Sequence, residues 1–374
     1  MHGSKWPYAV LSLALALGAV APFGCSASPS SSEPVDVEAE AAPPAPPKPP
    51  PTGEPVDPPA SGPTRLSETG LYADLAAKTL APGVLRFAPA HPLWADGAEK
   101  ERFFLLPPGT KIDTSDMDNW VFPVGTKMWK SFRIGGKLVE TRLLWKRDGK
   151  SRIQAWWNVA YVWEADGSDA IAKPDGVLSA LGTTHDVPNQ DDCVLCHAHV
   201  RDAIIGFSAI ELSSPSAGFA DAGTGDAGNS AGAPGTGLLL SFAKQGLFTN
   251  PPSADFAVPG TGITRDAIAY MHGNCGFCHK KDGQLQDQTA MRLRLLTTDT
   301  TAEQTGAQTT PIRLKMRHVM PPDIDEAVVP GQPEKSQLYQ RMLMDNVRMP
   351  PKGTKIVDPV GSALIRDWIL ALPP

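Results

Sequence analysis

The sequence has few cysteines, few histidines and no apolar run long enough to span a membrane. Five cysteines and eight histidines occur among 374 residues, too few thiols for a small fold held together by disulfides. The apolar stretch at residues 8–21 covers 14 residues, whereas a membrane-spanning helix needs about 20. At 41% hydrophobic and 20% charged residues, the chain still has enough apolar sequence for one or two buried cores.

A strong excess of charge of either sign is also absent. The formal net charge is −6, and most of the acidic excess lies in residues 33–64, which leaves the body from Arg65 onward with a charge of −2. Such a body has neither the basic field that attracts nucleic acid nor a polybasic patch for lipid headgroups. We therefore expect no nucleic-acid binding, and no membrane contact through surface charge.

The N-terminus predicts export. Lys5 precedes the apolar stretch at residues 8–21, which is the pattern of a secretory signal. Gly24 and Cys25, followed by small residues, resemble a bacterial lipoprotein signal. This resemblance implies that residues 1–24 are removed and that Cys25 is lipidated, which would tether a periplasmic protein to a membrane. An ordinary secretory signal cleaved beyond Cys25 is the alternative, and it also implies export.

Composition divides the remainder of the chain. Twelve prolines fall between Pro34 and Pro63, a density that favours extended polyproline II and cannot form a core. Residues 213–237 are rich in Gly, Ala and Ser, which is typical of a flexible connection. We expect a Pro-rich stalk at residues 25–64, a β-rich module at residues 65–186, a segment with the first pair of cysteines at residues 187–212, the flexible connection at residues 213–237 and a C-terminal domain at residues 238–374.

The β-rich module contains seven of the nine tryptophans. Gly135-Gly136 and Asp148-Gly149 are typical of two-residue hairpin turns. They predict a three-strand meander at residues 127–134, 137–147 and 151–163, with earlier strands at 102–106 and 120–124, and a sandwich or barrel-like sheet. Alternation places several large side chains on one face of these strands, where we expect them to form a core: Val139, Thr141, Leu143, Trp145, Trp157, Val159, Tyr161 and Trp163.

Four cysteines lie in two identical Cys-Xaa-Xaa-Cys-His frames, which carry the main functional signal. In a helix, the two thiols and the imidazole would fall at positions i, i+3 and i+4, on one face. This is the pattern of c-type haem attachment, in which the thiols form thioethers to the vinyl groups and the histidine ligates the iron. We therefore expect two covalent haems, the first held by Cys193, Cys196 and His197, the second by Cys275, Cys278 and His279.

Two other uses of the four thiols remain open. They could bind one structural zinc ion, although Cys196 and Cys275 lie 79 positions apart, unlike the ligands of a compact zinc ribbon. They could also form disulfides, since export implies an oxidising compartment. Neither alternative uses the two histidines.

The sequence around the second frame resembles a class I cytochrome c domain. Thr264 can cap a helix leading to Cys275, and Asp358 with Pro359 can start an apolar C-terminal helix. The two helices would cross and pack beside the haem. Met349, in the sequence Arg-Met-Pro-Pro, resembles the distal ligand of this family, which implies that His279 and Met349 ligate the second iron. A Met ligand raises the haem potential and fills the sixth position, which suits electron transfer.

The sixth ligand of the first haem has no clear sequence signal. Met320, also followed by two prolines, is a further candidate ligand for either iron. His199 is too close to His197 in sequence to reach the opposite face of the same haem. The remaining candidates are His91, His185, His272 and His318, and an open sixth position is the alternative.

Over residues 66–372 the chain resembles a family of bacterial di-haem c-type cytochromes that join a β-rich N-terminal module to a C-terminal cytochrome domain. The matching segments include residues 66–70, 92–100, 122–126, 140–144, 274–279 and 330–333. The resemblance implies export and electron transfer with unidentified redox proteins. Two alternatives remain: a di-haem peroxidase or dehydrogenase-associated subunit with an open first haem, and a zinc-stabilised binding lipoprotein.

Overall fold

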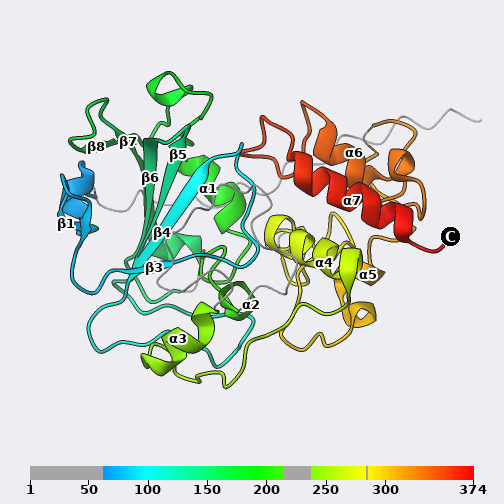
Figure 1. The fold of residues 1–374 in the computed structure, drawn as a ribbon, viewed down its shortest axis with the longest axis horizontal. Helices are drawn as coiled ribbons and strands as arrows, with labels where there is room; N and C mark the ends of the chain where they lie inside the picture. Colours follow the sequence, from blue (N-terminus) through cyan, green and yellow to red (C-terminus); the bar gives the residue numbers. More distant parts are fainter. Residues whose placement is uncertain (1–61, 151, 214–236, 284, 320) are drawn as a thin grey trace, which may run out of the picture. The chain divides into compact units, whose positions relative to one another are not determined.

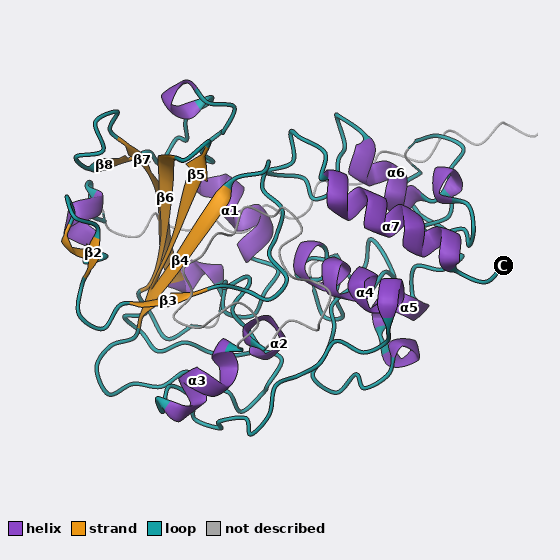
Figure 2. Ribbon diagram, viewed as in Figure 1, coloured by secondary structure: helices purple, strands orange, loops and turns teal. Residues whose placement is uncertain are grey.

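The computed structural model describes residues 62–150, 152–213, 237–283, 285–319 and 321–374. The expected signal sequence, Cys25, the Pro-rich stalk up to residue 61, nearly all of the Gly-rich connection and Met320 lie outside the described residues. The described chain has a mixed α+β fold, with its strands in the N-terminal half and most of its longer helices in the C-terminal half (Figures 1 and 2).

Six antiparallel strands form the main sheet in sequential order, so that each pairs with its neighbour in the chain. They are β3 (Leu85–Phe87), β4 (Glu99–Leu105), β5 (Lys127–Ile134), β6 (Lys137–Lys146), β7 (Trp156–Trp163) and β8 (Ala170–Ala172). Strands β1 (Tyr72–Asp74) and β2 (Thr79–Leu80) form a separate pair. The predicted meander β5–β6–β7 is confirmed. The main sheet is open, with β3 and β8 at its edges, so the described strands do not close into the barrel that the sequence suggested.

Three local predictions in this region were wrong. Asp148-Gly149 does not form a two-residue hairpin turn, because β6 ends at Lys146 and its partner β7 begins only at Trp156. Residues 120–124 do not form a strand, because only Val121 makes an isolated bridge, with Asp113, while Trp120 and Phe122 turn into an aromatic core. Strand β7 begins at Trp156 rather than at residue 151, because Ile153–Ala155 form a 3₁₀ turn. At the β5–β6 turn, Gly135 and Gly136 have φ values of 55° and 79°, the positive values that a two-residue hairpin requires.

The two faces of the sheet pack against different cores. On one face, alternate residues such as Trp129, Leu143, Trp157 and Trp163 pack with the N-terminal Leu66. The opposite face forms a second core with helical segments. The expected structural role of the tryptophans is thus confirmed for Trp129, Trp157 and Trp163. Val139 is an exception, because a bulge in β6 places it with Ala160 and Val162 instead.

The second core extends beyond the expected β-rich module. It contains Phe104 from β4 and Trp156 from β7, together with Phe207, Leu239 and Phe242. The last two belong to α3 (Leu238–Lys244), which the sequence assigned to the C-terminal domain. In Figure 1, α3 lies below the sheet and apart from the C-terminal helices.

The C-terminal helices enclose a third core. It is built mainly by α4 (Gly262–Asn274), α5 (Gly306–Thr309), α6 (Gln337–Leu343) and α7 (Pro359–Ala371). Helix α7 starts as predicted, because the Asp358 side chain accepts hydrogen bonds from the first backbone N–H groups. Helix α4 starts earlier than predicted, after Thr261 rather than Thr264.

Helices α4 and α7 pack directly against each other, as expected. The Tyr270 hydroxyl of α4 donates a hydrogen bond to Asp358 Oδ2 at 3.0 Å. Gly361 makes this approach possible, because a Cβ atom at this position would lie 2.3 Å from the Tyr270 ring.

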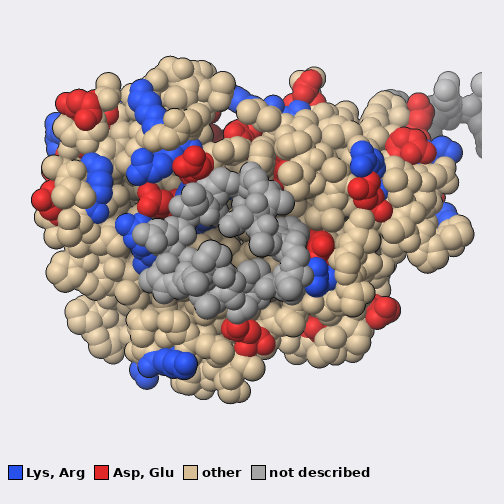
Figure 3. Space-filling view, viewed as in Figure 1, with Lys and Arg blue, Asp and Glu red and all other residues tan. Residues whose placement is uncertain are grey.

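Within the described residues, no helix combines the length and apolar character needed to cross a bilayer. Charged side chains of both signs are interspersed on the face shown in Figure 3.

Candidate functional site

The first frame lies on helix α1 (Gln190–His197), as predicted. Asn189 starts the helix by accepting a hydrogen bond from Asp192 N at 2.8 Å. The Gln190 side chain donates to the carbonyl oxygen of Asn158 in β7 at 2.6 Å, which holds α1 beside the sheet. A helix at this position presents Cys193, Cys196 and His197 on one face.

The imidazole of His197 is held in one tautomer. Its Nδ1 is hydrogen-bonded to the carbonyl oxygen of Ala203, and because a carbonyl can only accept, Nδ1 carries the proton. Nε2 is therefore left with a free lone pair when the ring is neutral. Desolvation lowers the pKa of His197 to about 4, so the ring is neutral near pH 7. A histidine held by a backbone carbonyl in this way is ready to ligate a metal through Nε2.

A cavity of about 580 Å³ adjoins the first frame. Its volume lies within the ~300–1,000 Å³ of typical small-molecule and cofactor sites. Cys193, Cys196 and His197 line one side, and residues of β5 and β6, such as Lys130 and Arg142, line another. Its remaining walls include residues from the C-terminal half of the chain, namely Arg341, Asp345–Met349 and Pro351–Lys355.

A buried ion-pair network lies in the sheet wall of this cavity. Glu140 is fully buried, and its two carboxylate oxygens lie 2.7 Å from Arg142 Nε and 2.7 Å from His185 Nε2. Burial alone would raise the pKa of Glu140, but the Arg142 charge and the His185 hydrogen bond outweigh it and hold the pKa low. His185 is thus engaged with Glu140, and ligating a metal through Nε2 would require this bond to break.

The second frame follows directly after α4. Cys275 caps the helix, and the chain continues in turns, with His279 N donating to Cys275 O at 2.9 Å. Regular helix therefore ends where the frame begins, unlike the first frame. Desolvation lowers the pKa of His279 to about 4. Its Nδ1 is buried, with no hydrogen-bond partner among the described residues.

All four frame cysteines are free and partly buried thiols. Burial raises the pKa of Cys193 to about 11 and that of Cys275 to about 12. The described residues contain no group of three or more Cys, His, Asp or Glu side chains placed to share a metal ion.

The fold brings the two frames near each other. Burial raises the pKa of Cys278, and the nearby Cys196 of the first frame raises it further. Burial lowers the pKa of His279, and His199, two residues beyond the first frame, lowers it further. Groups in and beside the first frame thus lie close enough to shift the pKa values of Cys278 and His279, which spacing alone did not predict.

Met349 contributes to the cavity beside the first frame. It is 36% exposed and lines the same cavity as His197, whereas Cys275, Cys278 and His279 do not line it. The pairing of Met349 with His279 stays a prediction. Among the other candidate ligands, His318 is exposed and His91 lines the cavity beside the first frame.

A buried Glu–His cluster connects the sheet region to α4. Glu211, on α2 (Ala209–Leu212), accepts a hydrogen bond from His91 N at 3.0 Å. Its other oxygen lies 3.5 Å from Nε2 of His272, whose Nδ1 accepts from Leu295 N at 3.0 Å. Sequence reasoning missed Glu211, because a lone Glu in a short apolar segment carries no motif.

Glu211 makes the stability of the protein depend on pH. Burial raises its pKa from 4.5 to about 8, so the folded state keeps a proton that the unfolded state loses above about pH 4.5. The free energy of unfolding should therefore fall as pH rises from about 4.5 to 8, by at most about 1.4 kcal/mol per pH unit. Glu211→Gln should remove this component, as measured by denaturant unfolding across that range. An unchanged slope in the variant would contradict a buried, protonated Glu211.

Comparison with known proteins does not place the chain in a family. No family model, curated protein or solved structure matches it.

Proposed function

We propose that this protein is an exported electron-transfer protein that carries two covalently attached c-type haems. The observation that supports this most strongly is the repeated set of two thiols and one neutral imidazole, brought together from distant parts of the chain. The N-terminal sequence supports export and lipid attachment through Cys25. The packing of α4 on α7 beside the second frame supports a cytochrome c-like C-terminal domain.

The residues of both frames fit such a group. Cys193 and Cys196 would anchor the first haem, and His197 would ligate its iron through Nε2, with Ala203 O fixing the ring. Cys275 and Cys278 would anchor the second haem, with His279 on its iron. The haems would supply reversible one-electron chemistry. The protein would contribute ligand identity, burial and the short separation of the two frames, and redox proteins would be its partners.

A redox titration followed by optical absorption tests this function. Protein matured in a host that attaches c-type haem should show two reversible one-electron transitions and low-spin spectra at both centres. A protein without any reversible haem transition would contradict the proposal.

The cavity beside the first frame supports a second candidate, a di-haem peroxidase or dehydrogenase-associated subunit, because a cavity of about 580 Å³ could admit a substrate. This candidate predicts high-spin iron at the first haem and turnover of peroxide or an organic donor. Two low-spin centres without turnover would exclude it.

A further inference from the structure

The segment that carries Met349 is attached by ion pairs to the part of the chain that carries the first frame. Lys352 Nζ lies 2.6 Å from Oδ1 of Asp192, the residue directly before Cys193 on α1. Lys355 Nζ lies 2.5 Å from Asp186 Oδ2, in the loop leading to α1. One ion pair therefore connects the residues after Met349 to the helix that carries Cys193, Cys196 and His197, and a second connects them to the loop before this helix.

Other contacts fix both ends of this segment. Before Met349, Arg341 Nε donates to Val347 O at 2.6 Å, and Met349 N donates to Arg341 O at 2.8 Å. After it, Ile356 N donates to Asp96 Oδ1 at 2.8 Å, and Trp94 Nε1 donates to Ile356 O at 3.1 Å. Met349 is thus presented on a segment held at several points, in the wall of the cavity beside the first frame.

Three other soft or nitrogen ligands line this cavity, namely His91, Met128 and His185. His91 is 3% exposed, and its backbone N–H is held by Glu211 Oε2 at 3.0 Å. Met128 is 5% exposed and packs into the aromatic core of the sheet. His185 Nε2 is bound to Glu140 at 2.7 Å. Met349 also lines the cavity and, unlike Met128, is 36% exposed. A thioether and an imidazole on opposite sides of the iron form a stable haem ligand pair.

We propose that Met349 is the sixth ligand of the first haem, on the iron bound by His197, and that the Lys352–Asp192 pair positions it. This inference rests on the proposed di-haem function and replaces the expected pairing of Met349 with His279. The two haems would then be linked through the protein, because a residue of the C-terminal half would ligate the iron of the N-terminal half.

Single-haem variants of the full chain test the assignment. Met349→Leu keeps the size and apolarity of the side chain but removes the sulfur. In a Cys275→Ser/Cys278→Ser background, which keeps only the first haem, Met349→Leu should abolish the far-red absorption of Met-ligated ferric haem and lower the midpoint potential. In a Cys193→Ser/Cys196→Ser background, it should change neither quantity. Met344→Leu, on the same segment, is the matched control and should have no effect in either background.

The reverse pattern, with a change only at the second haem, would overturn the proposal and leave the di-haem function intact. A lack of effect on either haem would also overturn it. Failure to attach haem at either frame would instead refute the proposed function.

A charge-reversal pair in the intact di-haem protein gives an independent result. Lys352→Glu places like charges beside Asp192 and should lower the potential of the transition that Met349→Leu also lowers. Adding Asp192→Lys should restore it. If Lys352→Glu leaves the midpoint potentials of both transitions unchanged, the ion pair does not position the ligand, and that part of the proposal is wrong. If it shifts the potential of a transition that Met349→Leu does not affect, the whole proposal is overturned.

Discussion

In the proposed di-haem protein, Cys193→Ser/Cys196→Ser should remove one of the two haems and leave the other attached. Both thioether bonds of the first haem need these sulfurs, and a hydroxyl does not replace them. Cys275→Ser/Cys278→Ser should likewise remove the second haem. We expect haem content per chain to fall by half in each case and to vanish when all four cysteines are replaced, as measured by the pyridine haemochrome spectrum of denatured protein.

Cys25→Ser provides the matched control, because Cys25 lies outside both frames. It should leave two haems per chain while abolishing any lipid attachment. Full haem content in either double-serine variant would show that the corresponding frame does not attach haem.

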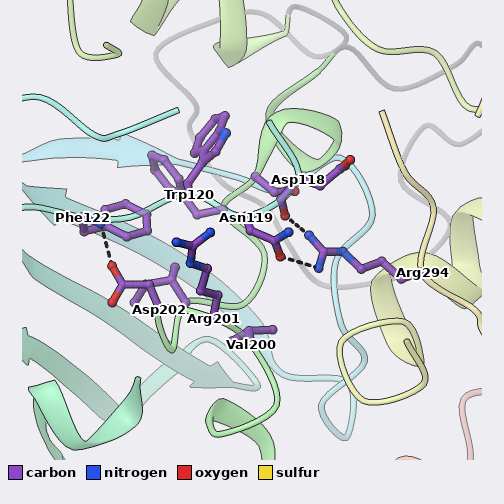
Figure 4. A pocket seen from close by; sticks show the side chains of 11 residues that line it. Asp118, Asn119, Trp120, Phe122, Val200, Arg201, Asp202 and Arg294 are labelled. Atoms are coloured by element: carbon purple, nitrogen blue, oxygen red, sulfur yellow. Dashed lines mark hydrogen bonds between the residues drawn. The ribbon is translucent and has the colours of Figure 1, made fainter. Parts of the chain in front are cut away.

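Asp202→Ala should destabilise the protein by about 3–5 kcal/mol, because it leaves a buried lysine without its counter-ion. Lys146 and Asp202 are both 1% exposed, with Nζ 2.8 Å from Oδ2. The same carboxylate accepts hydrogen bonds from Phe122 N at 2.6 Å and Trp156 Nε1 at 3.1 Å. Figure 4 shows the Asp202 carboxylate directed at Phe122. In the same view, Arg294 donates hydrogen bonds to the backbone carbonyl oxygen of Asp118 and to Asn119 Oδ1.

The effect of Asp202→Ala would be measured by denaturant unfolding. Lys146→Met combined with Asp202→Leu is the control, because it removes both charges and should recover much of the lost stability. A loss below about 1 kcal/mol for Asp202→Ala, the size typical of an exposed pair, would show that the charges are not buried in solution.

Asp202 also bears on the functional site. It directly precedes Ala203, whose carbonyl oxygen binds His197 Nδ1. Loss of the Asp202 contacts should therefore loosen the first haem before the second. This ordering would appear as an altered first-haem spectrum in Asp202→Ala at denaturant concentrations where the protein remains folded.

Sequence reasoning succeeded where a feature is local. The alternating residues of β5 to β7, the Gly135–Gly136 turn and the Asp358 cap of α7 each depend on a few adjacent residues. It failed at residues 120–124, where alternation is present but the aromatic side chains enter a core formed by distant segments. It also misplaced the start of α4, because Thr261 and Thr264 are equally good caps by composition.

The candidate site shows the same contrast between features set by adjacent residues and features set by distant ones. The frames are contiguous motifs and were recognisable from their spacing. The walls of the cavity were not, because they depend on pairings such as Lys352 with Asp192, 160 positions apart. The carbonyl that orients His197 and the buried Glu211 have no sequence signature, since any residue supplies a carbonyl and most glutamates are exposed.

The intact mass of the protein, purified from a host competent to attach c-type haem, tests the central claim most directly. After N-terminal processing is accounted for, we predict a single species that exceeds the mass of the mature chain by two haems. None of its four frame cysteines should react with a thiol-alkylating reagent after denaturation. A colourless chain with four alkylatable frame cysteines would contradict the account.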